Sequence, residues 1–243
     1  MDIEGIVLRI VPYKEKDAMV TILSKDGFVS FLARGILKID SKNAHLIGLY
    51  NKAIFELSEA KNGHISLKSG KILHFSGMMT KNLNNLLALD AIGEIILRMC
   101  DENSAKKLYD YLDAVIKNLN DDKVSSLTSC LIIGARTLIE NGYMMKVDGC
   151  VECGSKNKLV SFDFNSGGYI CVKHFNPLIH HNQNESYLKA IRLIFLVPFD
   201  KINLVNISLT DEILILNKMK EFILEQCGVT WNGIETLLKL IKK

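Results

Sequence analysis

Three cysteines and one histidine in the second half of the chain have the spacing of a metal site. Cys150 and Cys153 form a C-x₂-C pair, and Cys171 and His174 form a C-x₂-H pair after residues 154–170. Three thiolates and one imidazole can hold zinc in tetrahedral geometry. Because four protein ligands leave no position open for water or substrate, we expect a structural Zn²⁺ rather than a catalytic one.

A β-hairpin is expected to position these ligands. Residues 159–164 and 169–172 read as short strands, joined by a loop, Asn165-Ser-Gly-Gly168, that tolerates positive φ. This layout is that of a zinc ribbon, and we expect the insertion to span residues 147–178. Metal binding would stabilise the fold around it. A redox C-x-x-C and a zinc enzyme are the alternatives; the paired spacing disfavours the first and the closed ligand set disfavours the second.

Composition indicates an ordinary globular protein. The 243 residues are 48% hydrophobic and 23% charged, with no apolar run as long as a membrane span and no signal-peptide pattern at the start. We therefore expect a cytoplasmic protein without membrane contact, in which Cys100, Cys130 and Cys227 are buried thiols. The net charge of +3 lies wholly in residues 1–79, with eleven basic and eight acidic side chains. This excess of positive charge favours a polyanionic partner for the N-terminal region.

The hydrophobic pattern changes period near residue 80. Before it, five β segments are expected over residues 3–11, 18–24, 28–33, 44–57 and 64–75, with a hairpin turn at Lys25-Asp-Gly27. Five short strands suit a small barrel, of which the oligonucleotide/oligosaccharide-binding (OB) fold is the commonest. After it, helical periodicity covers 83–99, 108–119, 124–140, 187–196, 210–227 and 230–241. The prediction is an α+β protein: an OB-fold domain over 1–79 and an α-helical bundle over 80–243, carrying the zinc-binding insertion.

The order of these parts resembles the RecO family of bacterial recombination mediators. Near the N-terminus, the segments Gly5-Ile-Val-Leu-Arg9, Tyr13-Lys-Glu-Lys-Asp17, Val20-Thr-Ile-Leu-Ser24 and Ala33-Arg-Gly35 are similar to that family's opening pattern. The approach Met145-x-x-Asp148-Gly-Cys150 and the return Gly167-Gly-x-x-Cys171 are similar too. Two departures stand out: Ile36-Leu-Lys-Ile-Asp-Ser-Lys42 replaces a denser basic stretch, and His174 stands where a cysteine is common.

The resemblance implies a role in DNA repair and homologous recombination. It implies binding of single- and double-stranded DNA, annealing of complementary strands, and loading of the RecA recombinase, with RecR, onto strands coated by single-strand-binding protein (SSB). It also implies a site for the C-terminal tail of SSB and association with the bacterial nucleoid. No catalytic activity and no nucleotide cofactor are expected, and the sequence carries no phosphate-binding loop, nucleophile elbow or dinucleotide motif.

Phosphate contacts are expected from cations on the first strands and loops of the barrel, where they would displace counterions. The candidates are Arg9, Lys14, Lys16, Arg34, Lys38 and Lys42. Tyr13 could stack on bases, whereas strand alternation favours a core position for Phe31. For each cation the alternative is a solvated surface charge. For the whole protein the alternative is a zinc-ribbon adaptor that binds proteins and has no annealing activity of its own.

Overall fold

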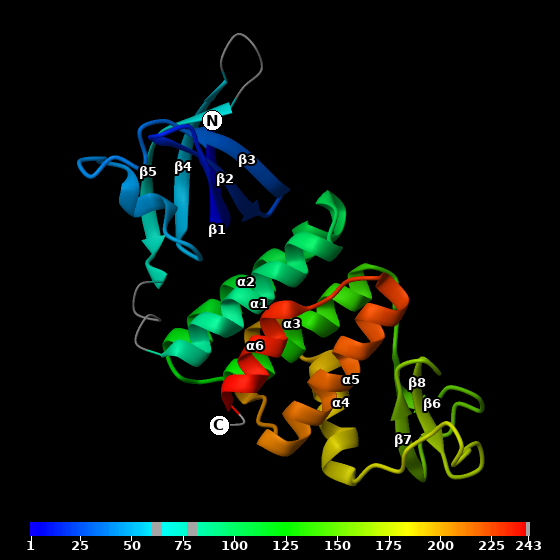
Figure 1. Cartoon of the computed structure of the whole chain (residues 1–243). Helices are drawn as coiled ribbons and strands as arrows, with labels where there is room; N and C mark the ends of the chain where they lie inside the picture. The colour runs from blue at the N-terminus through cyan, green and yellow to red at the C-terminus, as the bar shows by residue number, and fades with distance from the viewer. Residues whose placement is uncertain (60–64, 77–81, 242–243) are drawn as a thin grey trace.

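The N-terminal part of the protein is a closed five-stranded barrel (Figure 1). The computed structural model describes residues 1–59, 65–76 and 82–241. The strands are β1 (Asp2–Tyr13), β2 (Asp17–Ser24), β3 (Gly27–Ala33), β4 (Lys52–Glu59) and β5 (Ile65–His74), in the order β1-β2-β3-β5-β4, and β4 pairs back onto β1. All pairs are antiparallel except β3 with β5. This is the topology of an OB-type barrel, as predicted.

Alternation along the strands fills the barrel with apolar side chains. Phe31 is fully buried against Phe55, with ring centroids 5.3 Å apart, which confirms its predicted core position. The strand expected over residues 44–57 is wrong in its first half. Ala44–Ile47 forms a short 3₁₀ helix, η1, and β4 begins only at Lys52. Tyr50, at φ 63, adopts a left-handed conformation that interrupts any extended run.

In the described part of the chain, six α-helices form the rest of the core. They are α1 (Leu83–Met99), α2 (Glu102–Asn120), α3 (Ser126–Glu140), α4 (Glu185–Leu196), α5 (Leu209–Cys227) and α6 (Asn232–Ile241), with a 3₁₀ segment η3 (Phe199–Leu204) after α4. As its nearly all-round apolar sequence predicts, α3 is central and packs against α1, α2, α4 and α5. Helix α2 begins at Glu102, earlier than the start at residue 108 that periodicity predicts, because Asp101 caps it and Ser104 completes a capping box.

The barrel sits on α2 through both backbone and ionic contacts. Gly27, in the β2–β3 turn, lies so close to α2 that a Cβ atom there would be 2.8 Å from the carbonyl oxygen of Glu102. Lys52 Nζ lies 2.9 Å from Glu4 Oε1 and 2.9 Å from Asp113 Oδ2, which joins β4, β1 and α2. The β2–β3 end of the barrel therefore faces the helices. The β1–β2 turn lies one strand length, roughly 25 Å, away at the opposite end.

The insertion forms a three-stranded sheet at the other end of the molecule (Figure 1). Its order is β6 (Lys146–Cys150), β8 (Gly168–Cys171), β7 (Leu159–Asp163). The β7–β8 hairpin was predicted, but β6 was not, because it pairs in parallel with β8 and has no alternating pattern of its own. The domain division at residue 79/80 stays a prediction, since residues 77–81 lie outside the described ones. None of the described helices is long and apolar enough to cross a bilayer.

Candidate metal centre and nucleic-acid interface

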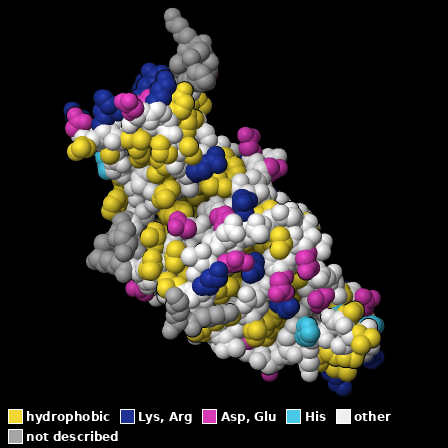
Figure 2. Space-filling model, viewed as in Figure 1, with side chains coloured by type: hydrophobic (Ala, Val, Ile, Leu, Met, Phe, Trp, Pro, Cys, Tyr) yellow, Lys and Arg dark blue, Asp and Glu magenta, His cyan; other side chains and the backbone are white. Residues whose placement is uncertain are grey.

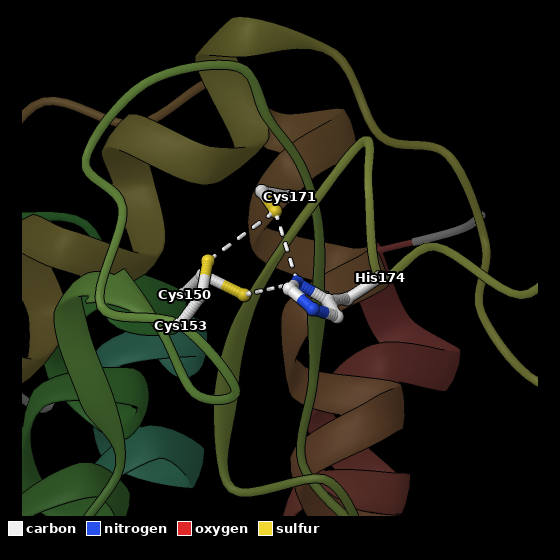
Figure 3. A group of neighbouring side chains, drawn as sticks. All are labelled: Cys150, Cys153, Cys171 and His174. Atoms are coloured by element: carbon white, nitrogen blue, oxygen red, sulfur yellow. Dashed lines mark hydrogen bonds between the residues drawn. The ribbon is translucent and has the colours of Figure 1, made fainter.

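The four predicted metal ligands converge on one point. Cys150 ends β6 and Cys171 ends β8, and each is followed by a tight turn. In these turns Gly154 N donates to Cys150 O at 2.9 Å, and His174 N donates to Cys171 O at 2.9 Å. The turns bring Cys153 and His174 back towards the strand ends, so that all four side chains point at one another (Figure 3).

The spacing of the ligand atoms fits a tetrahedral metal ion. All four lie within 4.8 Å of one another. Cys153 Sγ is 3.8 Å from Cys171 Sγ, and His174 Nδ1 is 3.3 Å from Cys171 Sγ and 3.7 Å from Cys150 Sγ. Ligands about 2.3 Å (S) and 2.0–2.1 Å (N) from one zinc ion would be roughly 3.5–3.8 Å apart at tetrahedral angles. The cluster could therefore hold a metal ion with little rearrangement.

The electrostatics favour the thiolate form at Cys150 and Cys171. Burial, the largest single influence, raises the pKa of Cys150, but hydrogen bonds from backbone N–H groups, led by that of Cys153, outweigh it and set this pKa at about 6. The hydrogen bond to His174 lowers the pKa of Cys171, and the same bond raises the pKa of His174. At Cys153 the hydrogen bond from the backbone of Ser155 lowers the pKa, but desolvation and the neighbouring Cys171 and Cys150 side chains outweigh it and raise the pKa overall. Thiolate is the form that binds a metal ion.

Aromatic packing attaches the ribbon to the helical body. Phe162 of β7 lies with its ring centroid 5.7 Å from that of Tyr169 and 6.1 Å from that of Phe195 on α4. Phe164 extends this contact to Phe222 on α5 at 5.5 Å. The four-residue cluster therefore lies on a sheet that is itself part of the protein core. Of the other cysteines, Cys130 is buried as expected, while Cys100 and Cys227 are half-buried.

The outer face of β1, β2 and β3 forms a groove at the end of the barrel away from the helices. The register places Val11 beside Met19, and Met19 beside Leu32. The groove has a volume of about 730 Å³ and is lined by Tyr13, Lys14, Asp17, Met19, Ser30, Leu32, Arg34 and Ile65. Two of the six predicted phosphate contacts, Lys14 and Arg34, therefore share one rim with an exposed aromatic ring. Figure 2 shows Lys and Arg side chains gathered at this end beside hydrophobic ones.

A hydrogen-bonded loop after β3 carries two further candidates, Lys38 and Lys42. Asp17 Oδ1 accepts from Gly35 N at 2.7 Å, and Lys16 O accepts from Leu37 N at 3.0 Å. These bonds bring Lys16, at the β1–β2 turn, to the start of the loop. Lys42 lies further along the loop. Arg9 is exposed on β1 and pairs with Thr21, below the groove lining.

Within the described residues, the six candidate phosphate-binding side chains form no ion pair. Across the described residues, the cations that form ion pairs are Lys52, Lys68, Arg98, Lys107, Lys117, Lys123, Lys189, Lys218 and Lys220. None of the six candidates is among them. Sequence reasoning missed the apolar floor formed by Met19, Leu32 and Ile65, which becomes visible only when strand register places these side chains on one face.

An OB-type barrel joined to a helical body with a Cys₃His ribbon is a distinctive combination, and comparison with known proteins identifies it. Residues 1–75 match the model of the recombination protein O N-terminal region, and residues 80–228 match that of the recombination protein O C-terminal region. The chain therefore belongs to the RecO family of DNA repair and recombination proteins.

Individual relatives agree with this assignment. A protein from Mesoplasma florum, named DNA repair protein RecO, is 28% identical over 244 residues, covering 98% of this chain and 90% of the relative. Proteins of the same name from Bacillus cereus (28% identical, 93% and 92% covered) and Thermoanaerobacter sp. (24% identical, 84% of each covered) are also similar. The resemblance thus extends over nearly the full length.

Proposed function

We propose that this protein is a recombination mediator that binds single- and double-stranded DNA through its barrel and anneals complementary strands. With RecR, it would promote loading of RecA onto SSB-coated single strands. The SSB tail would bind the helical body, the protein would work in the bacterial cytoplasm at the nucleoid, and no bond would be made or broken. These proposed functions specify how this chain would carry out the DNA repair role of its family.

One observation carries the proposal: the groove at the outer end of the barrel combines an exposed aromatic ring and an apolar floor with cations that have no ion-pair partner among the described residues. Lys14 and Arg34 stand on its rim, and Lys14 Nζ lies 5.3 Å from the centroid of the Tyr13 ring. Cations can neutralise phosphates, and exposed rings can stack on bases. Strands β2 and β3 form the face that OB-type barrels commonly use for oligonucleotides.

The phosphate-binding set remains Arg9, Lys14, Lys16, Arg34, Lys38 and Lys42. Lys14 and Arg34 line the groove, and the backbone oxygen of Lys16 accepts from the nitrogen of Leu37, the residue before Lys38. Lys42 is included because it lies on the same loop as Lys38. Arg9 is included because it is exposed on the same face of β1 as the groove.

Zinc is the metal we propose for the Cys150, Cys153, Cys171 and His174 cluster. Three thiolates and an imidazole, within 4.8 Å of one another, match the donor set and spacing that Zn²⁺ prefers. The ion would hold the two turns of the ribbon together, and it would take no part in the action on DNA. The division into residues 1–79 and 80–243, with the insertion at 147–178, belongs to the same proposal.

Fluorescence anisotropy with labelled oligonucleotides at two salt concentrations tests the proposal. We expect binding that weakens steeply with salt for both single-stranded and duplex probes. A second measurement mixes complementary strands and follows the rate of duplex formation. Pull-down with the cognate RecR tests the partner. Weak binding that does not respond to salt, with no acceleration of annealing, would contradict the DNA-binding proposal.

A protein-binding adaptor is the second candidate, and exposed apolar side chains on the ribbon favour it. Leu178 is 89% exposed and Ile179 is 62% exposed just beyond the metal cluster. Such side chains often belong to contact surfaces. If RecR is captured while oligonucleotides are not bound, the adaptor function would replace DNA annealing as the better description.

A further inference from the structure

Ile39 is the most exposed large hydrophobic side chain among the described residues. Its relative exposure is 108%, so it makes less contact with the protein than an isoleucine in an extended peptide would. It lies in the loop between β3 and η1, which Figure 1 shows projecting from the barrel away from the helices. A single exposed isoleucine is unremarkable by itself. Here, however, the exposed side chain lies on a loop that is held in shape by hydrogen bonds and surrounded by cations.

Backbone hydrogen bonds hold this loop in a defined shape. Lys38 N donates to Gly35 O at 3.3 Å, Ser41 N to Lys38 O at 3.1 Å, and Ala44 N to Ser41 O at 3.2 Å. The neighbouring Ile36 is 3% exposed and is part of the barrel core. The loop is therefore anchored on one apolar residue while it presents another to solvent.

Charges around Ile39 favour a polyanion as the partner. Lys38 precedes it and Lys42 follows it by three residues, and neither forms an ion pair within the described part of the chain. Counting the adjoining β1–β2 turn, five cations (Lys14, Lys16, Arg34, Lys38, Lys42) stand against three carboxylates (Glu15, Asp17, Asp40). One of the three, Asp17, is engaged by Gly35 N. A lipophilic tip within a cationic surface suits a ligand that alternates negative charges with apolar faces.

We infer that Ile39 is an apolar wedge that inserts between neighbouring bases of the nucleic acid bound by the barrel. Phosphates on either side would lie against Lys38 and Lys42, and the isoleucine would replace base–base stacking at one step. Apolar side chains that enter base steps in this way unstack the bases and kink the strand. The inference rests on the proposed function, because it requires that the barrel hold nucleic acid.

Oligonucleotides containing 2-aminopurine test the wedge, because the fluorescence of this base rises when it loses its stacking neighbours. We expect the wild-type protein to raise the fluorescence of bound probes at least twofold. Ile39→Ser should abolish most of this rise while weakening affinity, measured by anisotropy, less than tenfold, since the cations remain. Ile39→Leu should restore the rise.

Leu178→Ser is the matched control, because Leu178 is also highly exposed but lies on the ribbon. It should change neither fluorescence nor affinity. An equal fluorescence rise with wild type and Ile39→Ser at saturation would overturn the wedge but leave DNA binding intact. If the wild type binds no oligonucleotide, both proposals fail. The wedge would also be overturned if Ile39→Ser left the 2-aminopurine fluorescence unchanged but lost binding to RecR, or lost co-sedimentation with phosphatidylserine vesicles.

Discussion

The carboxylate of Asp17, the first residue of β2, accepts a hydrogen bond from the backbone nitrogen of Gly35 at 2.7 Å. The two residues are eighteen positions apart, and the bond ties the start of the cationic loop to the β1–β2 turn. Gly35 has φ 61, a left-handed conformation that glycine adopts without strain. An acidic residue therefore organises the most basic end of the barrel.

Two substitutions of Asp17 distinguish the effect of its negative charge on DNA binding from the effect of its hydrogen bond to Gly35. Asp17→Asn keeps an acceptor for Gly35 N and removes a negative charge, so we expect equal or tighter binding of oligonucleotides. Asp17→Ala removes both, and loss of the bond should destabilise the protein by about 1 kcal/mol and weaken binding severalfold. Anisotropy and urea unfolding measure the two effects. Tighter binding by both variants would mean that charge alone matters.

Arg34 should control the salt dependence of DNA binding. Arg34→Gln removes one of the proposed phosphate contacts, so the slope of log K against log salt should fall by about 0.7–0.9. The measurement is a salt titration of anisotropy with single-stranded and duplex probes. Lys218→Gln serves as control, because Lys218 is paired with Glu221 on α5, and its slope should match that of the wild type.

Loss of the metal should unfold the ribbon. Because Cys150 is buried at the cluster, Cys150→Ser should release the proposed zinc ion and lower the free energy of unfolding by about 3 kcal/mol, or roughly 6–12 °C in melting temperature. Elemental analysis and calorimetry report both changes. His174→Cys should keep the metal with four thiolates, and Cys227→Ala should keep it unchanged. A metal-bound, stable Cys150→Ser protein would contradict a structural role.

The ion pairs of Lys52, which join the barrel to the helices, should make the stability of the protein depend on pH in the acidic range. Its hydrogen bond, followed by that of Tyr109, lowers the pKa of Glu4. At Asp113, burial is the largest influence and raises the pKa, but hydrogen bonds from Lys117 and Lys52 reverse the direction. A carboxyl with a depressed folded pKa stabilises the protein above its unfolded pKa, and this stabilisation disappears as pH falls through the folded value.

We therefore expect Lys52→Met to lower the free energy of unfolding by about 2 kcal/mol at pH 7. The difference from wild type should shrink as pH falls below about 4, where the carboxyls become protonated. Urea unfolding at pH 7, 4 and 3 measures it. Lys68→Met is a control, since its pair with Glu56 is exposed and 3.6 Å long. A difference that stays constant with pH would contradict the assignment.

Gly27 should be essential for seating the barrel on α2. It has φ 107, and an added Cβ would meet the carbonyl oxygen of Glu102 at 2.8 Å. Gly27→Ala is expected to destabilise the protein by about 3 kcal/mol through strain and displacement of α2. Gly142→Ala is the control: φ is 88 and no atom lies within 4 Å, so backbone strain of about 1 kcal/mol should be its whole effect. If Gly27→Ala and Gly142→Ala lowered the free energy of unfolding in urea equally, close packing of Gly27 against α2 would be excluded as the cause.

The sequence by itself determined the parts and their order. Period-two and helical patterns gave the barrel and the helices because burial of one face dominates local structure. The C-x₂-C and C-x₂-H spacings predicted which four side chains converge, because each pair is local in sequence and has the spacing of a zinc site. Local patterns failed where partners are distant. The parallel strand β6, the left-handed Tyr50 and the start of β4 all depend on contacts with other segments.

Only the tertiary structure decided which surface residues act together. Lys14 and Arg34 are twenty positions apart in sequence, and it is the β2–β3 hairpin and its register with β1 that place them on one groove. The exposure of Ile39 is equally invisible in sequence, where the segment 36–39 reads as apolar and could be buried. Burial and register depend on the whole fold, because they arise from long-range packing that no short window of sequence contains.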